Sequence, residues 1–318
     1  MDLYKIKKDT LEPIDRESFK LEKDIQSIVE KNIETLFNLE FISTEFSVGD
    51  FRLDSLCFDN ESNSFVVIEY KKGSSYSVID QGYSYMSVML NNKSDFILEY
   101  IEKKGKPLKK SEVDFSQSRI IFISPSFNSY QKNSVNFKDV PFELWEIKKF
   151  SNNSISLNQH LSSSKESIQK IEGNKNSVIS NVGKEVKVFE EKDHTSKSNG
   201  SLIRNWELLK ERFSELDGVE IVPKRLYITL MYGNKTISYF IFRKDKIQME
   251  FVRGNIMTDG SKSKNYFVID DPKRISVEGT WTYKNGVQGG IYKIPLDKDS
   301  DVEYFIFLIK QKYKNIVN

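Results

Sequence analysis

Two apolar runs separated by a polar turn decide the fold of the first half of the chain: Phe51-Arg52-Leu53-Asp54-Ser55-Leu56-Cys57-Phe58 and Phe65-Val66-Val67-Ile68-Glu69-Tyr70-Lys71-Lys72. Both runs are rich in β-branched and aromatic residues, and residues 59–64 between them have the composition of a turn. We therefore expect a β-hairpin. Because successive side chains on a strand point to opposite faces, Glu69 and Lys71 share one face, and the hairpin brings Asp54 beside Glu69.

A carboxylate and an ammonium group on a core face are costly to bury unless they are paired or bind something. Two carboxylates and a lysine at the end of a small sheet form an oxygen-lined cation site with a positive charge beside it. Such a site suits metal-dependent cleavage of phosphodiester bonds. The alternative for Asp54, Glu69 and Lys71 is an ion pair on the surface, which contributes little to stability.

The composition predicts an intracellular protein that does not enter the membrane. The 318 residues are enough for two domains, and a single cysteine, Cys57, excludes an internal disulfide framework. The first residues lack the apolar run of a secretory signal, and no later segment approaches the roughly 18 apolar residues of a membrane span. We expect a cytoplasmic location. One cysteine and two histidines argue against a zinc site.

The net charge of +2 hides an asymmetry along the chain. Residues 1–150 carry 21 Lys and Arg against 25 Asp and Glu, whereas residues 201–318 carry 20 against 15. The basic C-terminal part is compatible with binding to a polyanion, and equally with an ordinary solvated surface.

The first 160 residues predict a mixed α/β domain, in which a sheet is flanked by helices. Besides the hairpin and a short strand at 2–7, the expected elements are helices at Phe19–Phe37, Ser77–Leu90, Asp95–Ile101 and Asn128–Asn136, and strands at Phe41–Val48, Arg119–Ser124, Phe142–Phe150 and Ser154–Leu157.

Residues 161–200 are rich in Ser, Asn, Lys and Glu, which predicts a flexible linker, either disordered or partly helical. Residues 201–318 predict a smaller α+β domain of unknown function, with a role in recognition as one option. Its expected elements are helices at Leu202–Leu216 and Val302–Ile316, and strands at Glu220–Tyr232, Thr236–Arg243, Lys246–Val252 and Gly289–Ile294.

The arrangement of Asp54 followed by Glu69-Tyr70-Lys71 resembles the signature of the PD-(D/E)XK nuclease superfamily, with its restriction-endonuclease-like fold. Gln81, with Tyr85 one helical turn later, is similar to the helix motif of the branch that includes archaeal mismatch-type endonucleases. The resemblance covers residues 19–150. Residues 201–318 look like an uncharacterised module that is often fused to such domains.

The resemblance implies a role for each matching residue. Asp54 and Glu69 would ligate Mg²⁺ or Mn²⁺, and Lys71 would activate the attacking water and stabilise charge on the phosphate. Three further residues would complete the site: Glu22 would support the metal, Gln81 would orient Lys71 or a phosphate, and Tyr85 would pack beneath the site or contact the substrate. Lys72 is a candidate for substrate binding.

The pattern Glu-x-Lys has little specificity, since Glu146-Ile147-Lys148 and Glu185-Val186-Lys187 share it. Only Glu69 has an aspartate opposite it in a hairpin, an acidic helix upstream and the Gln81 helix downstream. The residue before Asp54 is Leu53, where the signature has proline.

The sequence thus favours a Mg²⁺- or Mn²⁺-dependent endonuclease that hydrolyses phosphodiester bonds in nucleic acid, with DNA as the expected substrate. The alternative is a catalytically inactive module of the same fold that binds nucleic acid or a protein partner. The choice between DNA and RNA, the specificity, the pathway and the assembly state, a homodimer included, stay open.

Overall fold

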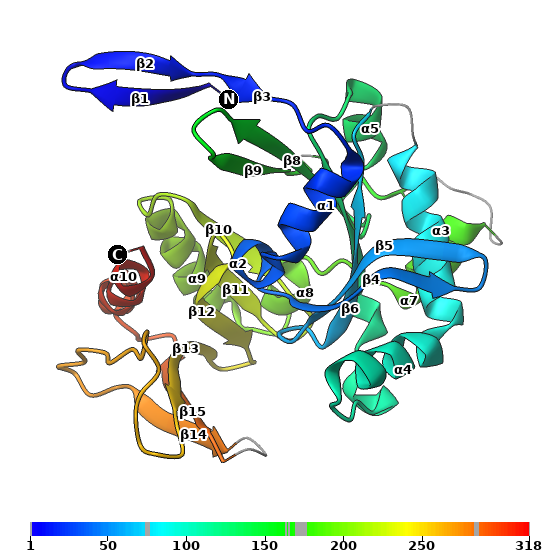
Figure 1. Ribbon diagram of the computed structural model, residues 1–318. Helices are drawn as coiled ribbons and strands as arrows, with labels where there is room; N and C mark the ends of the chain where they lie inside the picture. The colour runs from blue at the N-terminus through cyan, green and yellow to red at the C-terminus, as the bar shows by residue number, and fades with distance from the viewer. Residues whose placement is uncertain are drawn as a thin grey trace. The chain divides into compact units, whose positions relative to one another are not determined.

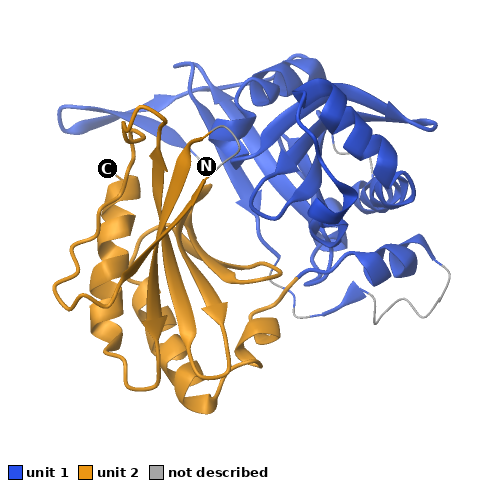
Figure 2. Cartoon of the chain, turned by 90° about the horizontal axis from the view of Figure 1, so that it is seen from below, with its two compact units in different colours: residues 1–188 blue, residues 189–318 orange. Residues whose placement is uncertain are grey.

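The chain divides into two compact units, residues 1–188 (unit 1) and 189–318 (unit 2), coloured separately in Figure 2. The computed structural model describes residues 2–73, 77–162, 164, 166–168, 177–282 and 286–317. No helix among these residues has the length and apolar character needed to cross a bilayer.

Unit 1 contains all the residues of the predicted nuclease motif, and its elements appear in Figure 1. Its strands are β1 (Leu3–Lys7), β2 (Thr10–Ile14), β3 (Arg16–Glu17), β4 (Glu40–Val48), β5 (Phe51–Asp59), β6 (Ser64–Tyr70), β7 (Arg119–Ser124), β8 (Phe142–Phe150) and β9 (Ile155–His160). Its helices are α1 (Glu22–Glu30), α2 (Ile33–Phe37), α3 (Val78–Asn91), α4 (Lys93–Lys104), α5 (Ser129–Ser134) and α7 (Val178–Glu185), with 3₁₀ turns at Lys110–Glu112 and Phe115–Gln117.

The main sheet of unit 1 is mixed, as the sequence predicts. Among the described residues it has seven strands, in the order β3-β8-β7-β6-β5-β4, with β9 on the other edge of β8. The β5–β6 hairpin is antiparallel and pairs Ser55 with Ile68, which sets Asp54 opposite Glu69 in the next position. Strands β6, β7 and β8 run parallel, so their carboxyl ends lie at the same edge.

Both faces of this sheet are covered. The α1–α2 segment packs on one face, against a core that includes Cys57, Ile68 and Ile121. Helices α3, α4 and α7 contribute to the core on the opposite face, around Phe65, Val67 and Phe122. Strand β6 is therefore buried along its whole length, which explains its continuous run of apolar residues.

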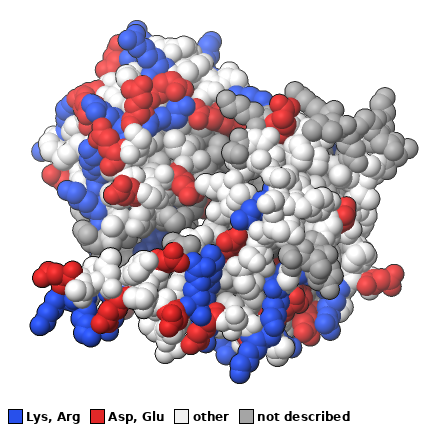
Figure 3. Space-filling view, turned by 90° about the horizontal axis from the view of Figure 1, so that it is seen from above, with Lys and Arg blue, Asp and Glu red and all other residues white. Residues whose placement is uncertain are grey.

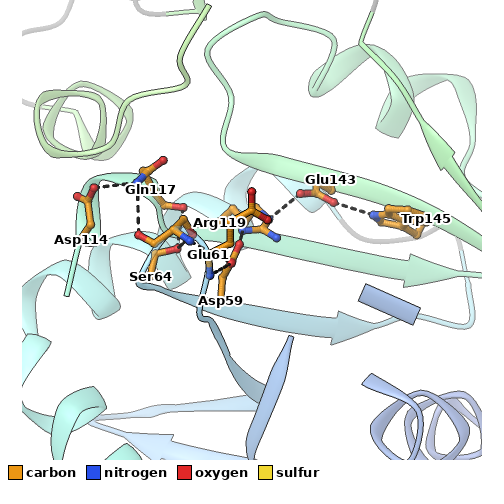
Figure 4. A network of polar contacts seen from close by, with 9 residues as sticks. Asp59, Glu61, Ser64, Asp114, Gln117, Arg119, Glu143 and Trp145 are labelled. Atoms are coloured by element: carbon orange, nitrogen blue, oxygen red, sulfur yellow. Dashed lines mark hydrogen bonds and ion pairs between the residues drawn. The ribbon is translucent and has the colours of Figure 1, made fainter. Parts of the chain in front are cut away.

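A partly buried charge network fixes the end of the sheet at which β6 and β7 begin (Figure 4). Arg119, the first residue of β7, donates to Asp59 at 2.9 Å and to Glu143 on β8 at 2.7 Å. Trp145 donates to the second oxygen of Glu143 at 2.8 Å. The network joins three strands at the end of the sheet opposite the one that carries Glu69 and Lys71.

The single helix predicted at Phe19–Phe37 is divided into α1 and α2. The side chain of Asn32 donates to the backbone oxygen of Ile28 at 2.8 Å, and its own φ and ψ are not helical. Asparagine competes with the helix for backbone groups in this way, so the chain bends after α1.

The segment predicted as a linker includes residues that pack on unit 1. Residues 163, 165 and 169–176 lie outside the described residues, but α7 is described, and Ile168, Val182 and Val186 belong to the core beneath α3. The boundary between the two units falls at Val188, inside the predicted 161–200 segment.

Unit 2 is an antiparallel sheet with helices packed on it. It contains α8 (Lys192–Thr195), α9 (Gly200–Phe213), β10 (Val219–Pro223), β11 (Ile228–Tyr232), β12 (Lys235–Phe242), β13 (Ile247–Ile256), β14 (Val277–Thr282), β15 (Gln288–Leu296) and α10 (Val302–Val317). The strand predicted at Glu220–Tyr232 is instead the hairpin β10–β11. Pro223, which has no N–H to donate, ends β10. The rings of Trp206 and Phe240 contact each other in the hydrophobic core of this unit.

Gly82 allows α3 to lie close to the sheet next to Gln81. A Cβ atom at this position would lie 2.7–2.9 Å from the ring of Phe142, which is shorter than a normal carbon–carbon contact. We expect Gly82→Ala to lower the free energy of unfolding by about 1–2 kcal/mol, because the overpacking cost exceeds the gain in helix propensity. The measurement is urea unfolding. Gly73→Ala, where a Cβ meets nothing within 4 Å, is the control, and equal stability of the two variants would contradict this packing argument.

Candidate active site

The predicted motif residues converge at the carboxyl end of β6. Asp54 lies on β5, Glu69 on β6, Lys71 just beyond β6, and Gln81 and Tyr85 one turn apart on α3. The Lys71 Nζ atom lies 2.7 Å from Glu69 Oε1. Glu69 is 3% and Lys71 9% exposed, so this pair is buried rather than the surface ion pair that was the alternative.

One oxygen of Glu69 accepts hydrogen bonds from three surrounding polar side chains. Glu69 Oε1 accepts hydrogen bonds from Lys71 Nζ, from Gln81 Nε2 at 2.8 Å and from Tyr85 OH at 3.3 Å. Gln81 also donates to the Tyr85 hydroxyl at 2.8 Å. Gln81 therefore contacts Glu69 and Tyr85, and its predicted role in orienting Lys71 or a phosphate stays a prediction. The buried Tyr85 donates to the same carboxylate oxygen.

Asp54 is held by the backbone of the neighbouring strand. Its Oδ2 atom accepts the backbone N–H of Tyr70 at 2.9 Å, the residue between Glu69 and Lys71. This contact fixes the Asp54 carboxylate next to the Glu69 carboxylate. The antiparallel hairpin explains it, since the side chain continues the ladder beyond the last backbone pair.

The two carboxyl groups hold their protons more tightly than usual. Burial and, to a smaller extent, the charge of Asp54 raise the pKa of Glu69 to about 7, although Lys71 and Gln81 offset part of the rise. Burial also raises the pKa of Asp54, with Tyr70 N–H and Lys71 opposing the rise and Glu22 adding to it. Burial is the main reason that both groups favour the protonated form, and repulsion by a neighbouring carboxylate adds to it in each.

Glu22 and Lys72 lie beside this centre and contact each other. Glu22 Oε1 accepts the backbone N–H of Lys72 at 2.8 Å, and Lys72 Nζ donates to the backbone oxygen of Lys20. Both side chains are exposed. Glu22 thus fixes the chain just after Lys71, and it acts on Asp54 through its charge.

The donor set fits a hard divalent cation that keeps several waters. Glu69 Oε2 is buried and has no hydrogen-bond donor among the described residues. Asp54 contributes a second carboxylate beside it, held through Oδ2 by the backbone N–H of Tyr70. No group of three or more His, Cys, Asp or Glu side chains suited to a metal occurs within the described ranges, so the residues present offer two carboxylates rather than a complete cage. Mg²⁺ is commonly bound by one or two carboxylates together with waters and substrate phosphate.

A second polar cluster, which sequence reasoning missed, supports Asp54 from α1. Gln26 is buried, and its Nε2 donates to the backbone oxygen of Asp54 at 3.1 Å and to Glu30 Oε1 at 2.9 Å. Glu30 also accepts from the Ser55 hydroxyl, which lies 3.0 Å from the hydroxyl of Tyr70. The available signal was Gln26 itself, a polar residue next to Ile25 on the apolar stripe of its helix.

Comparison with known proteins finds a relative that matches this chain over nearly its full length. No family model matches it. An uncharacterised protein of Haemophilus influenzae (strain ATCC 51907 / DSM 11121 / KW20 / Rd) is 38% identical over 327 residues, which cover 99% of this chain and 100% of that protein.

Two solved structures share a limited likeness with the chain. An EndoMS–dsDNA2 complex has a TM-score of 0.28 and 18% identity, covering 42% of this chain and 48% of that one. A repair endonuclease from Pyrococcus abyssi has a TM-score of 0.23 and 16% identity, covering 37% and 44%. The chain thus spans less than half the length of either, and likeness at this level carries no argument about activity.

Glu69 should make the stability of unit 1 depend on pH. Its carboxyl binds a proton more tightly in the folded chain, at a pKa of about 7, than at the ordinary value of 4.5. This contribution is complete below pH 4.5 and is lost as the pH rises through 7. Relative to Glu69→Gln, we expect the wild type to lose on the order of 1–3 kcal/mol of unfolding free energy over this range. Urea unfolding in EDTA measures it, with Glu102→Gln, exposed on α4, as the control. Parallel pH profiles for the wild type and Glu69→Gln would contradict this.

Proposed function

The chain belongs to the same family as the Haemophilus influenzae protein, and we propose that it is a metal-dependent endonuclease that hydrolyses phosphodiester bonds in nucleic acid, with DNA as substrate. The observation that carries the proposal is that the two oxygens of the Glu69 carboxylate differ in the number of hydrogen bonds they accept. One oxygen accepts three donors and the other, although buried, accepts none among the described residues, next to a second carboxylate on Asp54. A buried acceptor without a partner is costly, and a cation removes that cost.

Each residue of the proposed site then has a role. Asp54 and Glu69 would hold Mg²⁺ or Mn²⁺, and a metal bound there would supply Lewis-acid polarisation of the phosphate and a water of lowered pKa. Lys71, already positively charged beside Glu69, would orient the attacking water and stabilise the charge that develops on the phosphate. Gln81 and Tyr85 would keep the Glu69 carboxylate in place. Glu22 would act on the metal from outside, and Lys72 would contact substrate.

The alternative function is a binding module without turnover. The observation that favours it is that no group of three metal-ligand side chains is found among the described residues. Such a module would bind nucleic acid or a protein equally well in EDTA. A dependence of activity on divalent metal distinguishes the two.

The nuclease proposal predicts Mg²⁺- or Mn²⁺-dependent cleavage of DNA. We expect EDTA to abolish cleavage, and Lys71→Met to reduce its rate about 10²–10³-fold, the usual effect of removing one preorganised donor. Glu69→Gln should be at least as damaging. The measurement is single-turnover cleavage of labelled single-stranded, duplex and branched DNA.

Lys103→Met, on the exposed end of α4, is the matched control and should cleave at the wild-type rate. Circular dichroism of each variant separates loss of chemistry from loss of fold. The proposal is wrong if no substrate is cleaved with either metal, or if Lys71→Met cleaves as fast as the control.

Metal binding has a readout that does not depend on cleavage. Because a cation bound to the folded chain stabilises it by mass action, we expect Mg²⁺ or Mn²⁺ to raise the melting temperature. The rise should be larger at pH 8 than at pH 6, because a proton on Glu69, with its pKa of about 7, competes with the metal. Differential scanning calorimetry of the wild type and Asp54→Asn tests this. An equal rise in both proteins would show that the metal binds elsewhere.

A further inference from the structure

A pocket of about 250 Å³ lies beside Lys72, at the place where strand β8 changes its pairing partner from β7 to β3. Along one edge of β8, strand β7 pairs up to Glu146, and β3 takes over at Lys149 and Phe150. The pocket occupies this interruption. It is lined by Ile147 and Lys148 of β8, by Pro125 after β7 and by Arg16 of β3.

The chain itself links the pocket to the proposed site. Lys72, which lines the pocket, directly follows Lys71. The Glu22 contact to the backbone N–H of Lys72 fixes this short connection. The pocket and the proposed site are therefore joined by the single peptide link between Lys71 and Lys72.

The pocket carries an excess of positive charge. Four cations line it, Arg16, Lys72, Lys148 and Lys149, with Glu17 as the one acid in the lining. Glu17 pairs with Lys149 at 2.6 Å, and Glu146 is shared between Lys132 at 2.9 Å and Lys148 at 3.7 Å. Lys72 donates to a backbone oxygen. Arg16 pairs with Asp2 at 2.6 Å, so Lys72 and the shared Lys148 are the lining cations that neighbouring carboxylates balance least.

This excess is local rather than a property of a whole basic surface. On the face of the molecule in Figure 3, Lys and Arg lie among Asp and Glu. The pocket is also smaller than the roughly 300–1,000 Å³ of sites that enclose a whole small ligand. Its inner wall is apolar, since Phe19 and Ile147 are buried. Small size, lysines at the rim and an apolar wall suit one phosphate–sugar unit of a longer strand.

We propose that this pocket binds a backbone phosphate of the DNA strand on which the proposed active site acts, next to the phosphate that is cleaved. The inference rests on the proposed nuclease function for the identity of the strand. Lys72 and Lys148 supply the main contacts. Within the described chain Lys72 forms no ion pair with a carboxylate, and Lys148 shares Glu146 with Lys132.

The test measures DNA binding in EDTA, so that it needs no cleavage. Fluorescence anisotropy of a labelled oligonucleotide gives the association constant at several salt concentrations. Because each lysine that contacts phosphate releases counterions, we expect Lys72→Ala/Lys148→Ala to reduce the slope of log K against log salt by about 1 for each contact. Lys148→Arg, which keeps the charge, should restore the contribution of that position.

The control variant is Lys103→Ala/Lys109→Ala, which removes the same charge from exposed positions of unit 1 outside the pocket. Its slope should equal that of the wild type. Thermal melting of both double variants establishes that they fold. Equal slopes for the pocket variant and the control, or no DNA binding by the wild type, would overturn the inference.

Calorimetry with inorganic phosphate separates a strand contact from a site for a small anion. Phosphate binding that depends on Lys72 and Lys148, with an unchanged slope for DNA, would also overturn the inference. The nuclease proposal fails independently of these results. If the pocket variant changes the slope but no DNA is cleaved on adding Mg²⁺, the pocket inference stands and the nuclease proposal is wrong. If DNA is cleaved but the slopes are unchanged, the nuclease proposal stands and the pocket inference is wrong.

Discussion

The burial of Glu69 and Lys71 side by side is the constraint on which the arrangement of unit 1 depends. Removing either charge from water alone costs several kcal/mol, and a close pair offsets this cost only when further hydrogen bonds satisfy it. Gln81 and Tyr85 supply those bonds, but to one oxygen of Glu69 only. Burial is the main cause of the raised pKa of Glu69, and the negative charge of the nearby Asp54 adds to it. A ligand of positive charge completes such a site.

The fold brings these groups together from segments that are distant in the sequence. The hairpin sets Asp54 opposite Glu69, and the crossover from β6 to the parallel β7 runs through α3, so Gln81 and Tyr85 face the end of β6. Helix α1 supports the other side of β5 through Gln26. At the far end of the same strands, the half-buried Arg119 connects three strands through its contacts with Asp59 and Glu143. Rigid elements rather than loops therefore position most of the site, which favours precise geometry.

Much of this arrangement follows from local sequence patterns, and the exceptions have physical causes. The hairpin register was predictable, because a period of two and a polar turn leave one pairing that buries the apolar face. The direction of Gln81 was not, since helical spacing gives the face of a residue but not which of two nearby polar groups it contacts. Asn32 and Pro223 divided elements that apolar periodicity predicted as continuous. The contribution of α7 to the core depends on Val182 and Val186, two isolated apolar residues in a polar segment.

The acidic centre and the basic pocket would interact with a phosphodiester in opposite ways. Two carboxylates repel a phosphodiester, so the proposed site binds substrate only when a cation reverses the local charge. The proposed phosphate pocket would attract the strand whether or not a cation is present, because the charge of its lysines does not depend on metal. Affinity and chemistry are thereby assigned to different residues: Lys72 and Lys148 would hold the strand, whereas Asp54 and Glu69 would act only with metal. Such a separation allows a chain to bind nucleic acid without cutting it until the acids are neutralised.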